Sequence, residues 1–347
     1  MLANTNSEGL TIKSSKSPNK HTRPCVCCQQ STFTKLFDSY DFDTGKKRFS
    51  LETCNNCHLT RSSPVLSQTE LSAYYSKDYY GSSRQKFNPL VESWTIWSNN
   101  RLAKTILKSA QHSIGDKNKT PKVLDIGCGR ANLLKAFRNH GCECHGVERS
   151  DFPDEPDLEN ITIYKQDFLD KEFNENSYDI IVIWHVLEHL TDPVRTIRKA
   201  QKLLKTDGSL IVAVPNFASY QRIIFGKHWF HLDLPRHTYH FDPNSLSTLF
   251  LNSGLRIKSF STRSIDQSLF GFIQSAINFL SINPPNTLYS ILKTSQSRPG
   301  YLIIGTQLIL ASLLSPFALF EYIISAIMRR GTCLTIQSSK HQSRGSD

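Results

Sequence analysis

The chain has 347 residues, which is enough for about two domains with a sizeable core. Hydrophobic residues make up 39% of it and charged residues 20%, a balance that argues against disordered, collagen-like and polytopic membrane proteins. The net charge of +11 is unevenly spread. Residues 121–215 carry 12 Lys and Arg against 16 Asp and Glu, residues 1–120 carry 17 against 9, and residues 216–347 carry 12 against 5. An acidic centre between basic flanks favours an anionic substrate or membrane surface over nucleic acid as the partner.

Residues 1–23 are polar and basic, and no apolar segment typical of a secretion signal follows them. We expect a disordered tail and a cytoplasmic protein. In that compartment cysteines are reduced, so metal binding or simple burial is their expected role.

Four of the nine cysteines are spaced as two CxxC pairs, Cys25 with Cys28 and Cys54 with Cys57. Two such turns supply the four thiolates that a closed, structural Zn²⁺ site prefers. The aromatic segment 33–51 between them is typical of a β-hairpin, so residues 24–62 are predicted to form a zinc ribbon. A redox pair is the alternative, but no βαβ pattern surrounds either CxxC.

From residue 120 onward, short β-branched runs alternate with amphipathic helices, which predicts a parallel sheet covered on both faces. We expect strands at 122–126, 143–147, 161–166, 178–184 and 209–215, and helices at 130–140 and 193–205. Gly127 and Gly129 follow the first strand, and the acidic Glu148 ends the second, as in nucleotide-binding folds. A dinucleotide-binding dehydrogenase shares these features, although Asn132 stands where the third glycine of its GxGxxG motif is required.

Five stretches in order make the sequence resemble the class I S-adenosylmethionine-dependent methyltransferases: VLDIGCGRANLL (123–134), HGVERS (145–150), YKQDF (164–168), YDIIVIWHVLEHLTDP (178–193) and GSLIVAVPN (208–216). The resemblance implies a Rossmann-like α/β fold with a seven-stranded sheet and S-adenosylmethionine as cofactor. It also implies the cofactor-binding residues: Asp125, Gly127 and Gly129 at the methionine part, Glu148 at the ribose, Asp167 and Phe168 at the adenine, and His185 on the floor of the site.

Four histidines, His228, His231, His237 and His240, lie within 13 residues among aromatic side chains. Histidine has the side-chain pKa nearest neutrality and aromatic residues shape small-molecule pockets, so this segment is predicted to hold the acceptor and a base. A metal site is the alternative, but the spacing fits no zinc pattern. His228 and His231 are also explained as packing residues.

The same segment resembles the substrate loop of methyltransferases from polysaccharide and antibiotic-sugar pathways. It is similar to sugar C-methyltransferases that combine a cysteine-rich zinc module with this core, but their Glu-His pair is replaced by Arg236-His237. The replacement argues against C-methylation beside a sugar ketone and makes O-methylation with His237 as base at least as plausible. Arg236 would bind a phosphate or carboxylate of the acceptor, and His240 is expected beside it.

His189 is a second candidate catalytic residue, whereas Glu188 is expected to be a hydrogen-bonded structural residue. The surrounding HVLEH stretch is similar to quinone-ring O-methyltransferases, so the acceptor class stays open between small molecules and saccharides. An RNA methyltransferase, or a zinc-ribbon nucleic-acid-binding protein with a pseudo-enzyme core, is the remaining alternative. The residues after the strand at 178–184 are not the base-handling motif of the RNA enzymes.

The segment 301–328 contains 20 hydrophobic residues and one charge, Glu321. Pro316 is expected to divide it into two helical arms. Strands are predicted at 255–262 and 332–338, so residues 263–331 form an insertion whose ends return to one sheet, which excludes a single membrane crossing. Peripheral contact with the inner face of the membrane, a lid over the substrate, and ordinary buried helices are the three alternatives.

The predicted organisation is therefore a tail (1–23), a zinc ribbon (24–62), a helical cap (63–119), a methyltransferase core (120–262), an apolar insertion (263–331), the last strand of the core (332–338) and a tail (339–347). The ribbon and residues 74–100 are expected to cap the acceptor pocket. The expected acceptor is a sugar, a nucleotide-linked sugar or a lipid-linked saccharide, methylated on oxygen or carbon.

Overall fold

The structure is a computed structural model, and it describes residues 23–41, 47–75, 87–114, 119–149, 157–281, 284–293 and 300–340. The predicted N-terminal tail up to residue 22 and the last residues, 341–347, lie outside these ranges.

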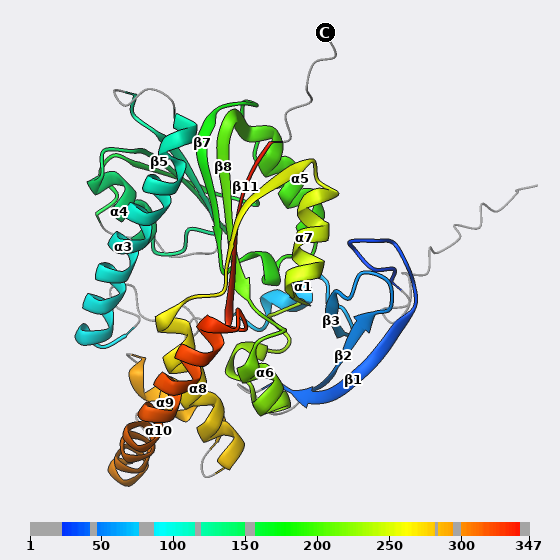
Figure 1. Ribbon diagram of the computed structural model, residues 1–347, viewed down its shortest axis with the longest axis vertical. Coiled ribbons are helices and arrows are strands. Elements are labelled where there is room, and N and C mark those ends of the chain that lie inside the picture. The colour runs from blue at the N-terminus through cyan, green and yellow to red at the C-terminus, as the bar shows by residue number, and fades with distance from the viewer. Residues whose placement is uncertain are drawn as a thin grey trace, which may run out of the picture.

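A seven-stranded sheet forms the centre of the molecule, in the order β10-β11-β8-β7-β4-β5-β6 (Figure 1). Its strands are β4 (Lys122–Ile126), β5 (Glu143–Glu148), β6 (Ile161–Lys165), β7 (Tyr178–Trp184), β8 (Leu204–Pro215), β10 (Leu255–Ser261) and β11 (Cys333–Lys340). β11 lies between β8 and β10 and is antiparallel to both, whereas the pairs from β8 to β6 are parallel. The seven-stranded sheet and its late antiparallel strand are confirmed.

The central strands are continuous apolar runs. Because successive side chains of a strand point to opposite sides, such a run is apolar on both faces of the sheet. In β7, Ile180 and Val182 join one hydrophobic cluster, and Ile181 and Ile183 join the other. Helices cover both faces (Figure 1). α3 (Pro89–Ile114) and α4 (Asn132–Asn139) lie on one side, and α5 (Pro193–Leu203) and α7 (Pro243–Leu251) lie on the other.

The N-terminal module forms a second, antiparallel sheet in the order β1-β2-β3-β9. β1 (Phe33–Tyr40) and β2 (Arg48–Cys54) are the predicted hairpin, β3 (Thr60–Ser63) follows, and β9 (Tyr239–His240) comes from the histidine-rich segment. Cys54, Leu59 and Tyr239 belong to the same hydrophobic cluster as the α5 side of the central sheet. The N-terminal module therefore shares a hydrophobic core with the central domain.

Short elements connect the two sheets. They are α1 (Gln68–Ser72), α6 (Tyr220–Phe225) and the 3-10 turns η1 (Leu187–His189), η2 (Gly226–His228) and η3 (Phe230–Leu232). Their packing makes a third cluster around Trp229, in which Phe49 and Leu51 of β2 meet Ala276 of the insertion.

The insertion contains α8 (Ile265–Leu280), α9 (Thr287–Leu292) and α10 (Tyr301–Ile327), which extend from one end of the sheet (Figure 1). The prediction of two arms was wrong, because α10 is one continuous helix with Pro316 inside it. A proline removes one helical hydrogen bond at a cost of about 3 kcal/mol. Packing along α8 and the helix-favouring residues on either side outweigh that cost.

α10 is the one helix in the described part of the chain that is long and apolar enough to cross a membrane. Only 11% of its most apolar window is buried, so it is not an ordinary core helix.

Candidate functional site

A cavity of about 520 Å³ lies at the carboxyl ends of the parallel strands, where nucleotide-binding sheets hold their ligands. Seven of the predicted site residues line it: Gly127, Gly129, Glu148, Asp167, Phe168, His185 and His189. Four others, Asp125, Arg236, His237 and His240, do not line it. A second cavity, of about 570 Å³, lies between the N-terminal module and α5 and shares Thr191 and Asp192 with the first.

The turn after β4 needs glycine for two different reasons. Gly127 has φ +75°, and a Cβ built there would lie 2.5 Å from a methyl group of Val186. Gly129 has φ +50°, but a Cβ there would meet no atom within 4 Å. Gly127 thus permits close packing of the turn. Gly129 keeps space open in the cavity just before α4, whose N-terminus favours an anionic group.

Glu148 closes the cavity at the end of β5. Its carboxylate accepts hydrogen bonds from the backbone N–H of Gly129 at 2.7 Å and of Arg149 at 2.9 Å. Asp125 is buried behind this turn, and its burial together with the charge of Glu148 raises the pKa of Asp125 to about 7. The geometry places Glu148 at the cavity surface and Asp125 as a buried support beneath it.

The far end of the cavity is formed by the loop after β6. Asp167 is exposed, and its Oδ1 accepts a hydrogen bond from the Leu169 N–H at 2.7 Å, while Phe168 is buried. Lys199 of α5 donates to the carbonyls of Phe168, Leu169 and Lys171. These bonds hold the loop against α5.

The turn after β7 concentrates titratable groups. Glu188 in η1 is 2% exposed, and neither of its carboxylate oxygens has a hydrogen-bond partner among the described residues. Its Oε1 lies 3.6 Å from Nδ1 of His185 and 4.0 Å from Nε2 of His237. Although burial alone would raise it, the pKa of Glu188 is lowered by His185, His189 and His237. The prediction that Glu188 is a hydrogen-bonded structural residue was wrong, because neither oxygen has a hydrogen-bond partner among the described residues and its carboxylate faces the imidazoles of His185 and His237 instead.

The imidazole of His189 lies between the cavity and this charge. Its Nδ1 is 3.1 Å from the carbonyl of Arg236 and 3.1 Å from the hydroxyl of Tyr75. A carbonyl only accepts, so Nδ1 carries the proton and Nε2 keeps the lone pair. Burial and the nearby His237 lower the pKa of His189 to about 4, which keeps the ring neutral near pH 7.

His237 lies behind His189, with ring centroids 4.5 Å apart. Its Nδ1 donates to the carbonyl of His231 at 2.9 Å, and its Nε2 faces Glu188 and Asp233. The structure thus brings both predicted catalytic histidines together, but only His189 reaches the cavity.

Arg236 and His240 are placed differently from their prediction as acceptor-binding residues. Arg236 is 5% exposed, forms an ion pair with Asp233 and donates to the Tyr74 carbonyl. His240 is 4% exposed, packs on Phe217 and lies 3.5 Å from the Ser62 hydroxyl. Arg236 was predicted to bind an anionic group of the acceptor. In the structure its guanidinium is instead paired with the carboxylate of Asp233, three positions earlier.

The sequence analysis did not name four residues that line the cavity. They are Trp184, Tyr75, and the ion pair of Glu92 with Arg130, whose charged atoms are 2.8 Å apart. Trp184 ends β7, and that position at a strand end was the available signal. Tyr75 and Glu92 lie in the segment 74–100 predicted to cap the pocket, but nothing in their spacing singles them out.

Backbone hydrogen bonds join the N-terminal module to the turn that carries Glu188. The Thr238 N–H donates to the Glu188 carbonyl at 2.9 Å, and the Thr238 carbonyl accepts from the Ser62 N–H at 2.9 Å. The Ser62 hydroxyl donates to the His237 carbonyl at 2.6 Å. One strip of chain, residues 237–240, therefore pairs with β3 on one side and with η1 on the other.

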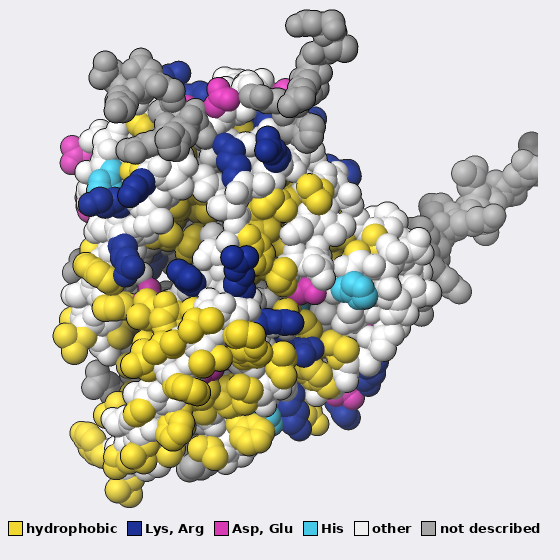
Figure 2. Space-filling view, in the orientation of Figure 1, with side chains coloured by type: hydrophobic (Ala, Val, Ile, Leu, Met, Phe, Trp, Pro, Cys, Tyr) yellow, Lys and Arg dark blue, Asp and Glu magenta, His cyan; other side chains and the backbone are white. Residues whose placement is uncertain are grey.

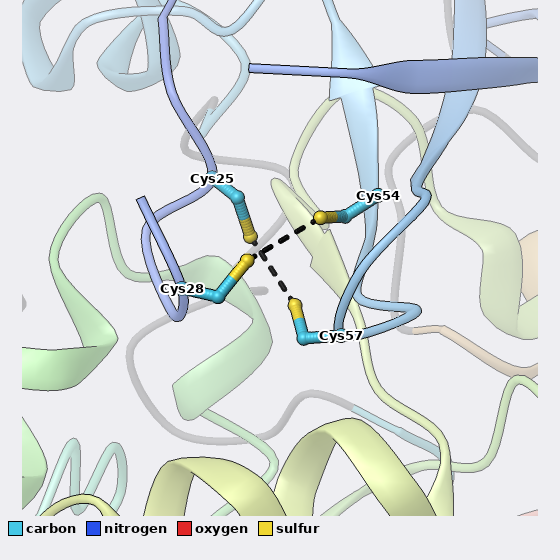
Figure 3. A group of neighbouring side chains, drawn as sticks. All are labelled: Cys25, Cys28, Cys54 and Cys57. Carbon is cyan, nitrogen blue, oxygen red and sulfur yellow. Dashed lines mark hydrogen bonds between the residues drawn. The ribbon is translucent and has the colours of Figure 1, made fainter. Parts of the chain in front are cut away.

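The two CxxC turns bring their four sulfurs together (Figure 3). The Sγ atoms of Cys25 and Cys57 are 3.4 Å apart, and those of Cys28 and Cys54 are 3.5 Å apart. Tetrahedral zinc with Zn–S bonds of about 2.3 Å requires S–S distances of about 3.8 Å, close to these values. Each turn ends in a left-handed residue, Gln29 or His58, whose N–H bonds to the carbonyl of the first cysteine.

A second group with metal-binding chemistry is Glu188, His189 and His237, whose ligating atoms lie within 4.8 Å of one another. These are the residues already described at the base of the cavity. One carboxylate and two imidazoles suit a divalent transition metal.

Residues 97–259 match the family model described as a methyltransferase domain. The chain is 29% identical over 193 residues to a ubiquinone biosynthesis O-methyltransferase from Coxiella burnetii (strain Dugway 5J108-111), covering 50% of this chain and 80% of that protein. It is 27% identical over 181 residues to a protein of the same name from Histophilus somni (strain 2336), covering 46% of this chain and 74% of that protein. Among solved structures, a putative sarcosine dimethylglycine methyltransferase from Galdieria sulphuraria overlaps with a TM-score of 0.48 at 14% identity, covering 79% and 98% of the two chains.

The matched segment is a methyltransferase domain, and the sheet order and the glycine turn of the central domain fit the fold of the class I S-adenosylmethionine-dependent methyltransferases. S-adenosylmethionine is the cofactor of that class. The open space at Gly129, the carboxylate of Glu148 and the loop of Asp167 suit its anionic, ribose and adenine parts in turn.

We predict that Gly129→Ala weakens the binding of S-adenosylmethionine at least about tenfold, because its Cβ would fill open space in the cavity. The matched control is Gly141→Ala. Gly141 also has a positive φ of +80° with nothing near its Cβ, but it follows α4 away from the cavity. Each substitution should cost about 1 kcal/mol of folding stability. Calorimetric titration and thermal melts would measure both effects, and equal cofactor affinity in the two variants would contradict the placement of the cofactor.

Proposed function

We propose that this chain transfers the methyl group of S-adenosylmethionine to a hydroxyl oxygen of a small-molecule acceptor, with His189 as the base. The observation that carries the proposal is the pairing at the end of β7. A neutral imidazole whose lone pair is on Nε2 lines the cavity, and a buried carboxylate without hydrogen-bond partners among the described residues lies beside it.

The chemistry assigns a separate task to each residue. Bound S-adenosylmethionine supplies an electrophilic methyl group on sulfur. The acceptor oxygen attacks this carbon, the C–S bond breaks, and the hydroxyl proton moves to Nε2 of His189. The Glu188 carboxylate offsets part of the cost that burial and His237 impose on the resulting imidazolium, while the Arg236 carbonyl and the Tyr75 hydroxyl hold Nδ1 in place.

A saccharide acceptor, free, nucleotide-linked or lipid-linked, is the class we favour. The cavity wall supports it with aromatic side chains, Tyr75, Phe87 and Trp184, beside the ion pair of Arg130 with Glu92. The second candidate is a ring hydroxyl of a quinone precursor, which the resemblance to the two ubiquinone biosynthesis O-methyltransferases favours. Both are O-methylations and use the same base.

We further propose that the four thiolates of Cys25, Cys28, Cys54 and Cys57 hold a structural Zn²⁺. Four thiolates complete the tetrahedral shell and leave no position for water or substrate. Its role would be to hold β3 in place, and through β3 the strip 237–240 and η1, the turn that carries Glu188 and His189.

The direct test is incubation of the full chain with methyl-labelled S-adenosylmethionine and cell extract, followed by sorting of the label into nucleotide-sugar, lipid, quinone, RNA and protein fractions. We expect label in a saccharide-containing fraction. His189→Gln should lower the transfer rate at least about 100-fold, since it removes the proton acceptor. Cofactor affinity should stay within about twofold, because Gln keeps a similar volume.

His237→Gln is the matched control, because His237 lies in the same cluster but does not line the cavity. We expect a smaller loss, about tenfold, from the changed surroundings of Glu188. A greater loss in His237→Gln than in His189→Gln would make His237 the base. Label confined to RNA or protein would contradict the small-molecule acceptor.

The pH dependence provides a separate prediction. The neutral imidazole is the active form, and the pKa of His189 is lowered to about 4, so the rate should fall only as the pH drops through that value. We expect kcat/KM to be flat between about pH 6 and 8 and its acid limb to lie well below the ordinary histidine value of about 6.5. An acid limb centred near 6.5 would contradict a buried His189 as base.

Cys54→Ser should remove the bound zinc and lower the thermal stability of the full chain, because one thiolate of the tetrahedron is lost. Cys27→Ser is the matched control, since Cys27 neighbours Cys28 but is not part of the four-sulfur group. Metal content by mass spectrometry and thermal melts would measure the two variants. Equal zinc content in both would contradict the assignment.

A further inference from the structure

The polarity of α10 is reversed relative to a helix of a water-soluble core. Its buried residues are Gln307, Ala318, Glu321 and Ser325, three of which are polar. Eleven large apolar side chains are exposed instead: Tyr301, Leu302, Leu308, Ile309, Leu313, Phe317, Leu319, Phe320, Ile323, Ile324 and Ile327. The spacing of positions 307, 318, 321 and 325 puts the buried residues on one face of the helix.

The neighbours of α10 share part of this reversal. Of the seven buried residues of α8, five are small or polar (Ser268, Gly271, Gln274, Ser275 and Asn278) and two are Ala276 and Ile277, while Phe279 and Leu280 are exposed at its end. α6 buries Gln221 beside Phe225 and exposes Ile223 and Ile224. Small and polar residues at helix contacts with apolar residues outside are typical of helices packed within lipid.

Polar contacts hold the three helices together from within. The Gln221 amide of α6 donates to Glu321 of α10 at 2.9 Å and to the Ser268 carbonyl of α8 at 2.8 Å. Asn278 of α8 donates to the Asn286 side chain at 3.1 Å. The apolar surface is therefore not needed for the cohesion of the insertion, and it remains available to a partner.

The chemistry of the rim indicates which partner fits. Figure 2 shows Lys and Arg side chains between the apolar lower end and the rest of the molecule. Residues 263–331 contain five Lys and Arg against two Asp and Glu, and Arg263, Arg329 and Arg330 are exposed where the insertion joins the sheet. Trp94 and Trp97 of α3 are about half exposed, and Trp94 donates to Asp266 at the start of α8. A belt of cations and tryptophans beside an apolar surface is typical of the membrane interface.

Both ends of the insertion leave the sheet at one place. A Cβ built on Gly331 would lie 2.0 Å from the carbonyl oxygen of Thr262, so the last residue of the insertion contacts the residue just before its start. A segment with touching ends enters and leaves a bilayer from the same side. Phe87, which lines the cavity, packs against Tyr289 of α9 with ring centroids 5.9 Å apart, so the site lies beside this end of the molecule.

We propose that the exposed apolar face of α6, α8 and α10 inserts into one leaflet of an anionic phospholipid bilayer, with the basic rim at the headgroups. The proposal concerns the insertion alone and holds whichever acceptor is methylated.

The test is flotation of the full chain with vesicles of phosphatidylcholine, alone or mixed with phosphatidylglycerol. Wild type should float with both and bind the anionic vesicles more tightly, and added salt should reduce that difference. Combined Leu313→Glu, Phe317→Glu and Phe320→Glu should weaken partitioning more than about 100-fold, because three lipid-facing side chains become charged. Arg329→Glu with Arg330→Glu should weaken only anionic binding, by about fivefold or more for each arginine.

The matched control combines Leu36→Glu, Tyr40→Glu and Leu251→Glu, three exposed apolar residues outside the insertion, and it should float like wild type. Titration with S-adenosylmethionine shows that each variant is folded, independently of its lipid binding. Failure of wild type to float with either vesicle would overturn the proposal. A dimer that the Leu313, Phe317 and Phe320 substitutions dissociate, without vesicle binding by wild type, would also overturn it and assign the face to a second copy.

Discussion

Two hydrogen bonds of Thr238 connect the parts of this molecule on which its chemistry depends. The Thr238 amide binds the Glu188 carbonyl beneath the cavity, and its carbonyl binds Ser62 of the N-terminal sheet. Each such bond contributes only about 1 kcal/mol. Their importance lies in position, since η1 is a single turn with no sheet partner of its own. A base that must approach the acceptor within about 3 Å tolerates little displacement of that turn.

The turn held by Thr238 also carries a buried negative charge, the carboxylate of Glu188. In a site with few hydrogen-bond donors, a buried charge is stable only if neighbouring cations or imidazoles compensate it. His185, His189 and His237 surround Glu188, while Arg236 compensates Asp233 a few residues away. Arg236 and His237 of the histidine-rich segment therefore lie beside the buried carboxylates of Asp233 and Glu188 and do not line the cavity. His189, from the preceding turn, is the histidine of this group that lines the cavity together with His185.

The fold of the central domain was predictable because its central strands β4, β7 and β8 are apolar on both faces, and because Gly127, Gly129 and Glu148 mark the ends of β4 and β5. The two CxxC pairs likewise predicted their own convergence. The tasks of Arg236, His237 and His240 were not predictable, since they depend on Asp233 and on β3, which contact them only in the folded chain. For α10, Pro316 predicted a break in the helix, but packing keeps the helix continuous. Which face of α10 is buried depends on its contacts with the neighbouring helices, so the burial of its polar residues was not predictable from the sequence.

The coupling between the N-terminal module and the turn that carries Glu188 and His189 can be measured directly by hydrogen exchange in the full chain, with the proposed Zn²⁺ added and after chelation. With metal bound, the amides of Ser62 and Thr238 should be protected. After chelation, they and the amides of residues 187–190 should exchange faster together, while those of β4 and β5 stay protected. Unchanged exchange at Thr238 and residues 187–190, in a module that has itself opened, would contradict the account.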